Sequence, residues 1–160
     1  FLNALSGSPE ILTKEMLNNK TLISDLQTLY SGVGRESGST SFLEDMFLKS
    51  SHYDSVIATE SSLIRINKEL SLRGKTPLYL LYPVDGVALN DSPFAYVDYG
   101  QNKKETFLKL QSFLLSKEEQ AKLETMGKRT WYGGVNTNAS KKIFDPSLGI
   151  DTSLYLPESF

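Results

Sequence analysis

Two hydroxyl groups and one carboxylate stand next to one another at Thr59, Glu60 and Ser61. They follow an apolar, β-branched run at residues 53–58, and a helical spacing of apolar residues begins at Leu63. This pattern predicts a strand, a polar turn and a helix. The carboxyl ends of strands in an open α/β sheet face the ligand crevice, and a helix N-terminus there offers unpaired N–H groups. We therefore expect these three side chains to lie at a ligand-binding edge.

The elements that would position this edge follow from the apolar pattern of the whole chain. Residues 77–83 and 94–98 have the composition of two further strands, the first bracketed by prolines. The resulting fold class is α/β, a sheet flanked by helices. Helices are expected at about residues 13–17, 21–30, 41–48 and 63–72, and as a pair that meets at Ser116 between residues 101 and 126. Residues 129–160 are expected to be an irregular segment pinned by Trp131, Phe144 and Tyr155.

A second group of polar residues precedes the helix at 41–48. Arg35, Ser39 and Thr40 lie in a Gly-Ser-rich loop, and Ser41 with Glu44 has the spacing of a capping box. Such a loop could clamp a carboxylate or phosphate, or it could be a surface arginine next to a capped helix. Tyr82 and Ser92 flank turns, and they join the Thr59 edge if the strands are parallel.

Composition excludes several classes of function. With 39% hydrophobic and 22% charged residues and a formal net charge of −2, the 160 residues have the character of a globular domain that does not bind nucleic acid. The single imidazole, His52, and the absence of cysteine leave no nucleophile–base pair and no metal-ligand set at a recognised spacing. We expect no enzyme activity, no metal and no cofactor.

Four segments in a fixed order, residues 59–61, 81–86, 91–95 and 113–120, resemble the later half of bacterial extracellular solute-binding proteins with the type II periplasmic fold. Residues 129–151 are similar to the segment that leads, in some of these proteins, into a von Willebrand factor A domain. The resemblance implies a solute-binding-like domain at residues 1–128, excised from a longer protein and lacking most of its first lobe. Residues 129–160 would then lead to a missing downstream domain.

The resemblance also implies a function, a location and a set of partners. The chain would be an extracytoplasmic module that binds a small solute or a peptide, at the cell surface or in the periplasm, anchored to a membrane only through a missing segment. The alternative is a structural or adhesive scaffold with a vestigial cleft that contacts a von Willebrand factor A domain or another protein. Glu60 suits a cationic or hydroxyl-bearing ligand, or a structural hydrogen bond to a neighbouring loop. The candidate ligand-binding residues are Arg35, Ser39, Thr40, Thr59, Glu60, Ser61, Tyr82 and Ser92.

Overall fold

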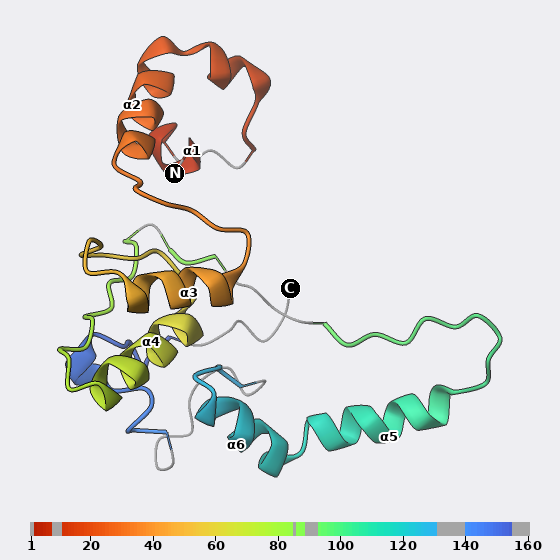
Figure 1. The fold of residues 1–160 in the computed structure, drawn as a ribbon. Coiled ribbons are helices and arrows are strands. Elements are labelled where there is room, and N and C mark those ends of the chain that lie inside the picture. Colours follow the sequence, from red (N-terminus) through yellow and green to blue (C-terminus); the bar gives the residue numbers. More distant parts are fainter. Residues whose placement is uncertain (1, 8–10, 85, 89–92, 131–139, 155–160) are drawn as a thin grey trace. The chain divides into compact units, whose positions relative to one another are not determined.

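The structure is a computed structural model that describes residues 2–7, 11–84, 86–88, 93–130 and 140–154. The chain divides into two compact units, Phe1–Ser55 and Val56–Phe160. Figure 1 shows the helices of both units, which we call unit 1 and unit 2. Each unit is described separately below.

Unit 1 contains helices and turns. Its elements are α1 (Leu2–Leu5), the 3-10 helix η1 (Lys14–Asn18), α2 (Lys20–Ser31) and α3 (Thr40–Lys49). The stripe of apolar residues predicted a helix over most of α2, and the structure confirms it, with Leu22 buried. The helix near residue 41 is also confirmed, but the predicted cap is wrong. Ser39 rather than Ser41 occupies the N-cap of α3.

Unit 2 contains α4 (Glu60–Leu72), α5 (Lys104–Leu114), α6 (Lys117–Thr125) and the short 3-10 helix η2 (Pro146–Leu148). The predicted helix pair that meets at Ser116 is confirmed. The Ser116 side chain caps α6 by accepting a hydrogen bond from the Glu119 N–H at 3.4 Å. A serine followed three residues later by glutamate therefore located a helix boundary inside a long apolar pattern.

The predicted α/β fold class is wrong, because the described residues form helices and loops and contain no strand. The three segments expected as strands do not pair with one another. Residues 78–82 bond instead to the Asn67 side chain and to Leu148 at the end of η2, and Phe94 and Tyr96 lie against α5. Alternating apolar residues predict an extended backbone, but a sheet also requires a ladder of hydrogen bonds between strands.

The core of unit 2 forms where one extended segment meets the C-terminal loop. Leu80, Phe144 and Ile150 are 4%, 1% and 4% exposed, and Leu63 and Ile64 of α4 pack against them. Gly149 allows the close approach, since its φ is +82° and a Cβ there would lie 2.3 Å from the Leu80 carbonyl oxygen. Phe144 was predicted to pin the tail, and its burial confirms that role. Trp131 and Tyr155 lie outside the described residues.

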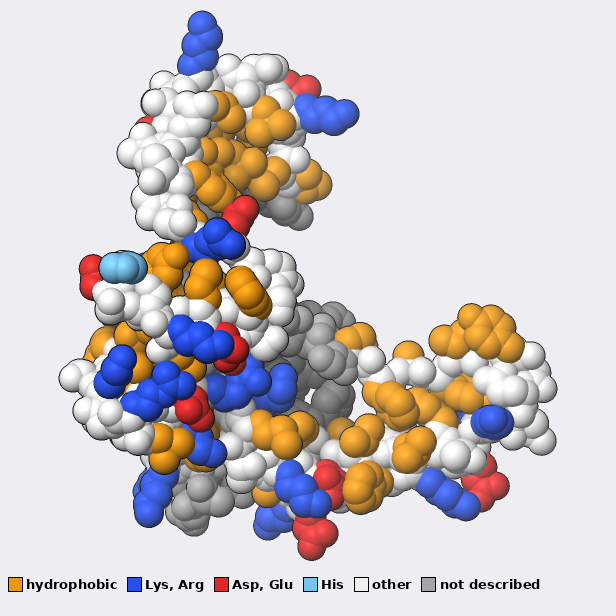
Figure 2. Space-filling view, in the orientation of Figure 1, with side chains coloured by type: hydrophobic (Ala, Val, Ile, Leu, Met, Phe, Trp, Pro, Cys, Tyr) orange, Lys and Arg blue, Asp and Glu red, His pale blue; other side chains and the backbone are white. Residues whose placement is uncertain are grey.

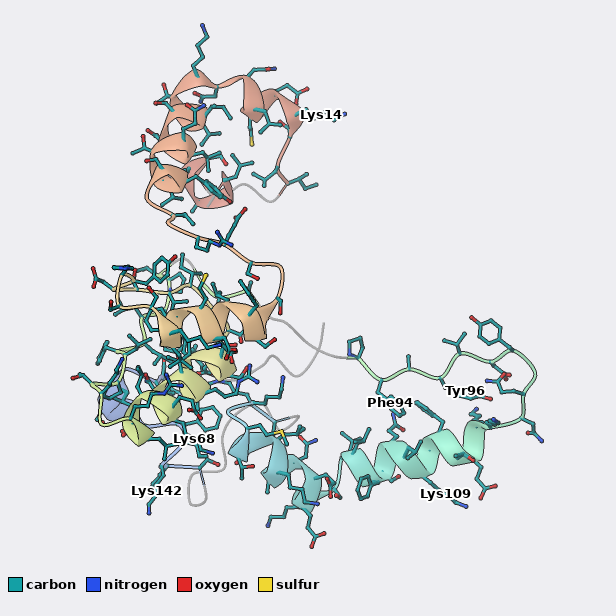
Figure 3. The ribbon with its side chains drawn as sticks, viewed as in Figure 1. Lys14, Lys68, Phe94, Tyr96, Lys109 and Lys142 are labelled. Atoms are coloured by element: carbon teal, nitrogen blue, oxygen red, sulfur yellow. The ribbon has the colours of Figure 1, made fainter. Side chains whose placement is uncertain are left out.

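α5 is solvated on most of its surface. Phe94 stacks on Phe107 with ring centroids 4.8 Å apart, and Tyr96 packs on the same ring at 5.5 Å. Figure 3 shows Phe94 and Tyr96 on the extended segment that runs beside this helix. Figure 2 shows hydrophobic side chains at the surface in this region, and its exposed members include Leu108, Leu110 and Phe113.

Candidate functional site

The hydroxyl groups of the predicted edge are used to start α4. Thr59 is the N-cap residue, and its Oγ1 accepts a hydrogen bond from the Ser62 N–H at 3.3 Å. The same oxygen lies 2.9 Å from the Ser62 Oγ and 3.2 Å from the Ser61 Oγ. Ser62 is fully buried, whereas Thr59 is exposed and Ser61 is half-buried. The first of these contacts satisfies one of the orphan N–H groups of the helix start.

The Glu60 carboxylate is held by two other side chains. Arg129 donates from Nε to Oε2 at 2.8 Å and from Nη2 to Oε1 at 2.7 Å, which is the bidentate geometry of a strong arginine–carboxylate pair. The Tyr82 hydroxyl donates to Oε1 at 2.5 Å. Only 19% of the Glu60 side chain and 12% of the Arg129 side chain are exposed. The pair is therefore largely shielded from water.

Arg129 reaches beyond Glu60 into the C-terminal loop. Its Nη2 also donates to the Asp151 carbonyl oxygen at 2.6 Å, and its Nη1 donates to the Leu154 carbonyl oxygen. The guanidinium carbon lies 5.7 Å from the centroid of the Phe144 ring, within the range of a cation–π contact. One side chain thus joins the start of α4 to residues 144–154.

This environment changes the acidity of two groups. Burial, together with the hydrogen bond to Glu60 and its charge, raises the pKa of Tyr82 to about 12. Burial alone would lower the pKa of Arg129, but the hydrogen bonds and charge of Glu60 prevail and raise it. Tyr82 therefore stays protonated and Arg129 stays charged at neutral pH, so neither is suited to exchange protons with a substrate.

The structure brings Tyr82 to the start of α4, where Thr59, Glu60 and Ser61 lie, but it does not bring the other predicted residues there. Ser39 of unit 1 accepts a hydrogen bond from the Phe42 N–H at 3.4 Å, so its hydroxyl caps α3. Thr40 is the first residue of α3 and is exposed. Arg35 is exposed and forms no ion pair or hydrogen bond with the described residues. Ser92 lies outside the described residues.

No group of three or more His, Asp or Glu side chains that could hold a metal ion occurs among the described residues. The helices within the described part of the chain include none with the length and apolar character needed to cross a membrane. Comparisons of the chain with protein-family models, with curated proteins and with solved structures gave no match.

Arg129 is the residue that sequence reasoning missed. It lies 69 residues from Glu60 in the chain, and no local spacing links the two. The sequence did contain one general signal. An acid at the start of a helix that packs on a core needs a countercharge when it becomes shielded from water. That signal requires a cation but does not say which of the 17 lysines and arginines supplies it.

Proposed function

We propose that the chain is a non-catalytic scaffold module whose partners are other polypeptides. The observation that supports this function is the state of Glu60, the one acid of the candidate site. Both of its carboxylate oxygens accept hydrogen bonds from Arg129, and one also accepts from Tyr82. Glu60 therefore acts as a cross-link within unit 2, which corresponds to the structural hydrogen bond that the sequence left open as an alternative.

A small cationic solute at Glu60 would have to displace Arg129. Removing one member of a shielded ion pair leaves the other charge without a partner, at a cost of about 3–5 kcal/mol in buried cases. A solute would need to offset that cost before it gained any affinity. The small-solute function is therefore the less favoured of the two functions expected from the sequence.

The surface of unit 2 suits contact with polypeptides. Leu110, Phe113 and Leu114 of α5 are 49%, 56% and 43% exposed, and they are accompanied by exposed apolar residues on the segment that runs beside this helix. Extended apolar surface of this kind is typical of protein interaction sites. A von Willebrand factor A domain stays a candidate partner through the family resemblance alone, and the extracytoplasmic location stays a prediction.

A thermal-shift screen with cationic and hydroxyl-bearing solutes tests the proposal. A solute at about 100 times its Kd stabilises a folded protein by about 2.7 kcal/mol. For a chain of 160 residues this corresponds to a rise in Tm of roughly 5–10 °C. We expect no solute in the screen to produce such a rise.

Two variants, each compared with its own Tm without solute, sharpen the screen. Glu60→Gln keeps the shape of the side chain but removes its charge, and Glu105→Gln makes the same change on the exposed face of α5. A solute that raised the Tm of the wild-type chain and of Glu105→Gln, but not that of Glu60→Gln, would establish small-solute binding at Glu60. That result would refute the scaffold proposal.

A further inference from the structure

Residues 78–82 have the side-chain pattern of an extended segment with one buried face. Leu80 is 4% exposed, and Leu78 and Tyr82 on either side of it are half-buried. Tyr79 and Leu81, which alternate with them, are 66% and 83% exposed. Strict alternation of this kind is the pattern of a β-strand that packs on a core through one face.

One edge of this segment is occupied by hydrogen bonds. In an extended chain, the N–H and C=O of one residue point to the same edge, and those of the next residue point to the opposite edge. The Leu78 N–H donates to Oδ1 of Asn67 at 2.7 Å, and its C=O accepts from Nδ2 of Asn67 at 2.8 Å. The Leu80 N–H donates to the Leu148 carbonyl oxygen at 2.8 Å. The Leu78 backbone and the Leu80 N–H therefore have partners within unit 2.

Within the described part of the chain, the opposite edge has no hydrogen-bond partner. The backbone groups of Tyr79 and Leu81 form no hydrogen bond with any residue that the structure describes. Pro77 and Pro83 belong to the same odd-numbered edge and have no N–H. The edge thus offers two N–H donors, and a proline stands three residues from Leu80 on each side.

We propose that this edge is a self-association site at which a second copy of the chain adds the same segment in antiparallel orientation. The twofold axis would pass between Leu80 and the second copy's Leu80. Tyr79 would exchange both of its backbone hydrogen bonds with the second copy's Leu81, and the same exchange would occur in reverse. Four hydrogen bonds would form, and each proline would face a proline at the end of the pair, where no N–H is needed.

Three features favour a second copy over an unrelated peptide. The edge is its own complement under a twofold rotation, since its two donors and two prolines are symmetric about Leu80. Residues 76–84 contain no charged side chain, so two copies meet without like-charge repulsion. The exposed Leu81 side chain would lie across from Tyr79 of the second copy, whose ring rests against Gly149 of its own chain.

The same features limit the assembly to two copies. The even-numbered edge is already occupied by Asn67 and Leu148. The prolines prevent the pairing from continuing along the open edge, which is the usual protection of an exposed strand against open-ended aggregation. The self-association site does not depend on the proposed scaffold function, because a small solute bound at Glu60 would leave the backbone groups of Tyr79 and Leu81 unchanged.

Sedimentation of the whole chain over a concentration series tests the proposal. The series extends to about 1 mM, because two short strands bury less area than a stable interface of about 1,200 Å². We expect a monomer–dimer equilibrium. Leu81→Pro removes an N–H that has no partner among the described residues, and it should raise the dimer Kd by about tenfold or more. Far-UV circular dichroism checks that each variant keeps its helix content.

A second variant and a control separate edge pairing from general stickiness. Leu81→Lys keeps the backbone N–H but places like charges across the pair, so it should also raise the Kd. Tyr99→Lys makes a comparable change at a residue that is 86% exposed elsewhere in unit 2, and it should leave the Kd unchanged. In the wild-type chain, hydrogen exchange at the Tyr79 and Leu81 amides should slow as the concentration rises.

Either of two results would overturn the proposal. One is a chain that stays monomeric across the whole series. The other is an association that both Leu81 variants leave unchanged, because the copies would then meet through another surface.

Discussion

Helices α4 and α5 belong to the same compact unit and have similar lengths of 13 and 11 residues, yet α4 has four buried residues and α5 has none. Both helices carry apolar residues at helical spacing. The difference lies in what each helix contacts. Glu60 and Asn67 of α4 bond to Arg129 and Leu78, whereas the ring contacts of α5 are those of Phe107 with Phe94 and Tyr96 of the segment that leads into it.

The contrast shows that apolar periodicity determines where a helix forms but not how deeply it is buried. α4 packs on the apolar core through Leu63 and Ile64. Its Glu60 and Asn67 also bond to other segments of unit 2. The stability of unit 2 should therefore be concentrated in the α4 region. Pairs of matched substitutions, one near α4 and one near α5, test that difference.

The largest effect is expected at the core aromatic ring. Phe144→Ala removes a side chain that is 1% exposed, and it should lower the free energy of unfolding by about 3–5 kcal/mol. Phe94→Ala removes a ring that is 48% exposed beside α5, and it should cost roughly 1–1.5 kcal/mol. Urea unfolding followed by circular dichroism measures both values. Equal losses would show that the α5 region is as tightly packed as the α4 region.

The next effect concerns two ion pairs, Glu60–Arg129 at the start of α4 and Glu105–Lys109 on α5. Arg129→Met should lower the free energy of unfolding by about 2–4 kcal/mol, because Glu60 keeps its charge in a shielded place without a countercharge. Lys109→Met removes the partner of Glu105 on α5, where both side chains are more than 70% exposed, and it should cost at most about 0.5 kcal/mol. The same urea titration measures both variants. A loss for Arg129→Met as small as that for Lys109→Met would mean that water screens the Glu60 pair.

These two comparisons also show what the sequence can reveal. Local signals located most of the helices, and Ser116 marked the start of α6 with cap geometry that depends on a few neighbouring residues. The pairing of extended segments was not predictable in this way. Leu78 bonds to an asparagine side chain rather than to another strand, and no composition rule distinguishes these two partners.

The candidate site was predictable only in part, for the same reason. Thr59, Glu60 and Ser61 were expected at a helix start after an extended run, and they lie at the start of α4. Glu60 also lies next to Tyr82, although no sheet brings them together. Its main partner, Arg129, depends on a contact across 69 residues, and such a contact becomes visible only once the chain is folded.

A smaller effect is expected from two side chains that bond to the backbone. Asn67→Ala should lower the free energy of unfolding by about 1–3 kcal/mol, because it leaves the N–H and C=O of Leu78 without partners at a half-buried position. Gln101 makes the same two kinds of bond, to Val97 and Tyr99, in an exposed turn before α5. Gln101→Ala should change the free energy by less than about 0.5 kcal/mol, since water can replace these bonds. If both variants lost the same free energy, burial would not be what separates the two regions.

The last effect is a dependence of stability on alkaline pH that comes from Tyr82. Its pKa is about 12 in the folded chain, against about 10 for an unfolded tyrosine. Below about pH 10 the phenol is protonated in both states, and its contribution to stability is fully present. Between about pH 10 and 12 the unfolded chain releases the proton first, so the free energy of unfolding falls through this window.

Tyr82→Phe should remove this part of the decrease, whereas Tyr99→Phe, at an exposed residue before α5, should retain it. Urea titrations of the three proteins at pH 9 and pH 11.5 measure the difference, and an equal decrease in Tyr82→Phe and the wild-type chain would contradict the link between Tyr82 and the Glu60–Arg129 pair.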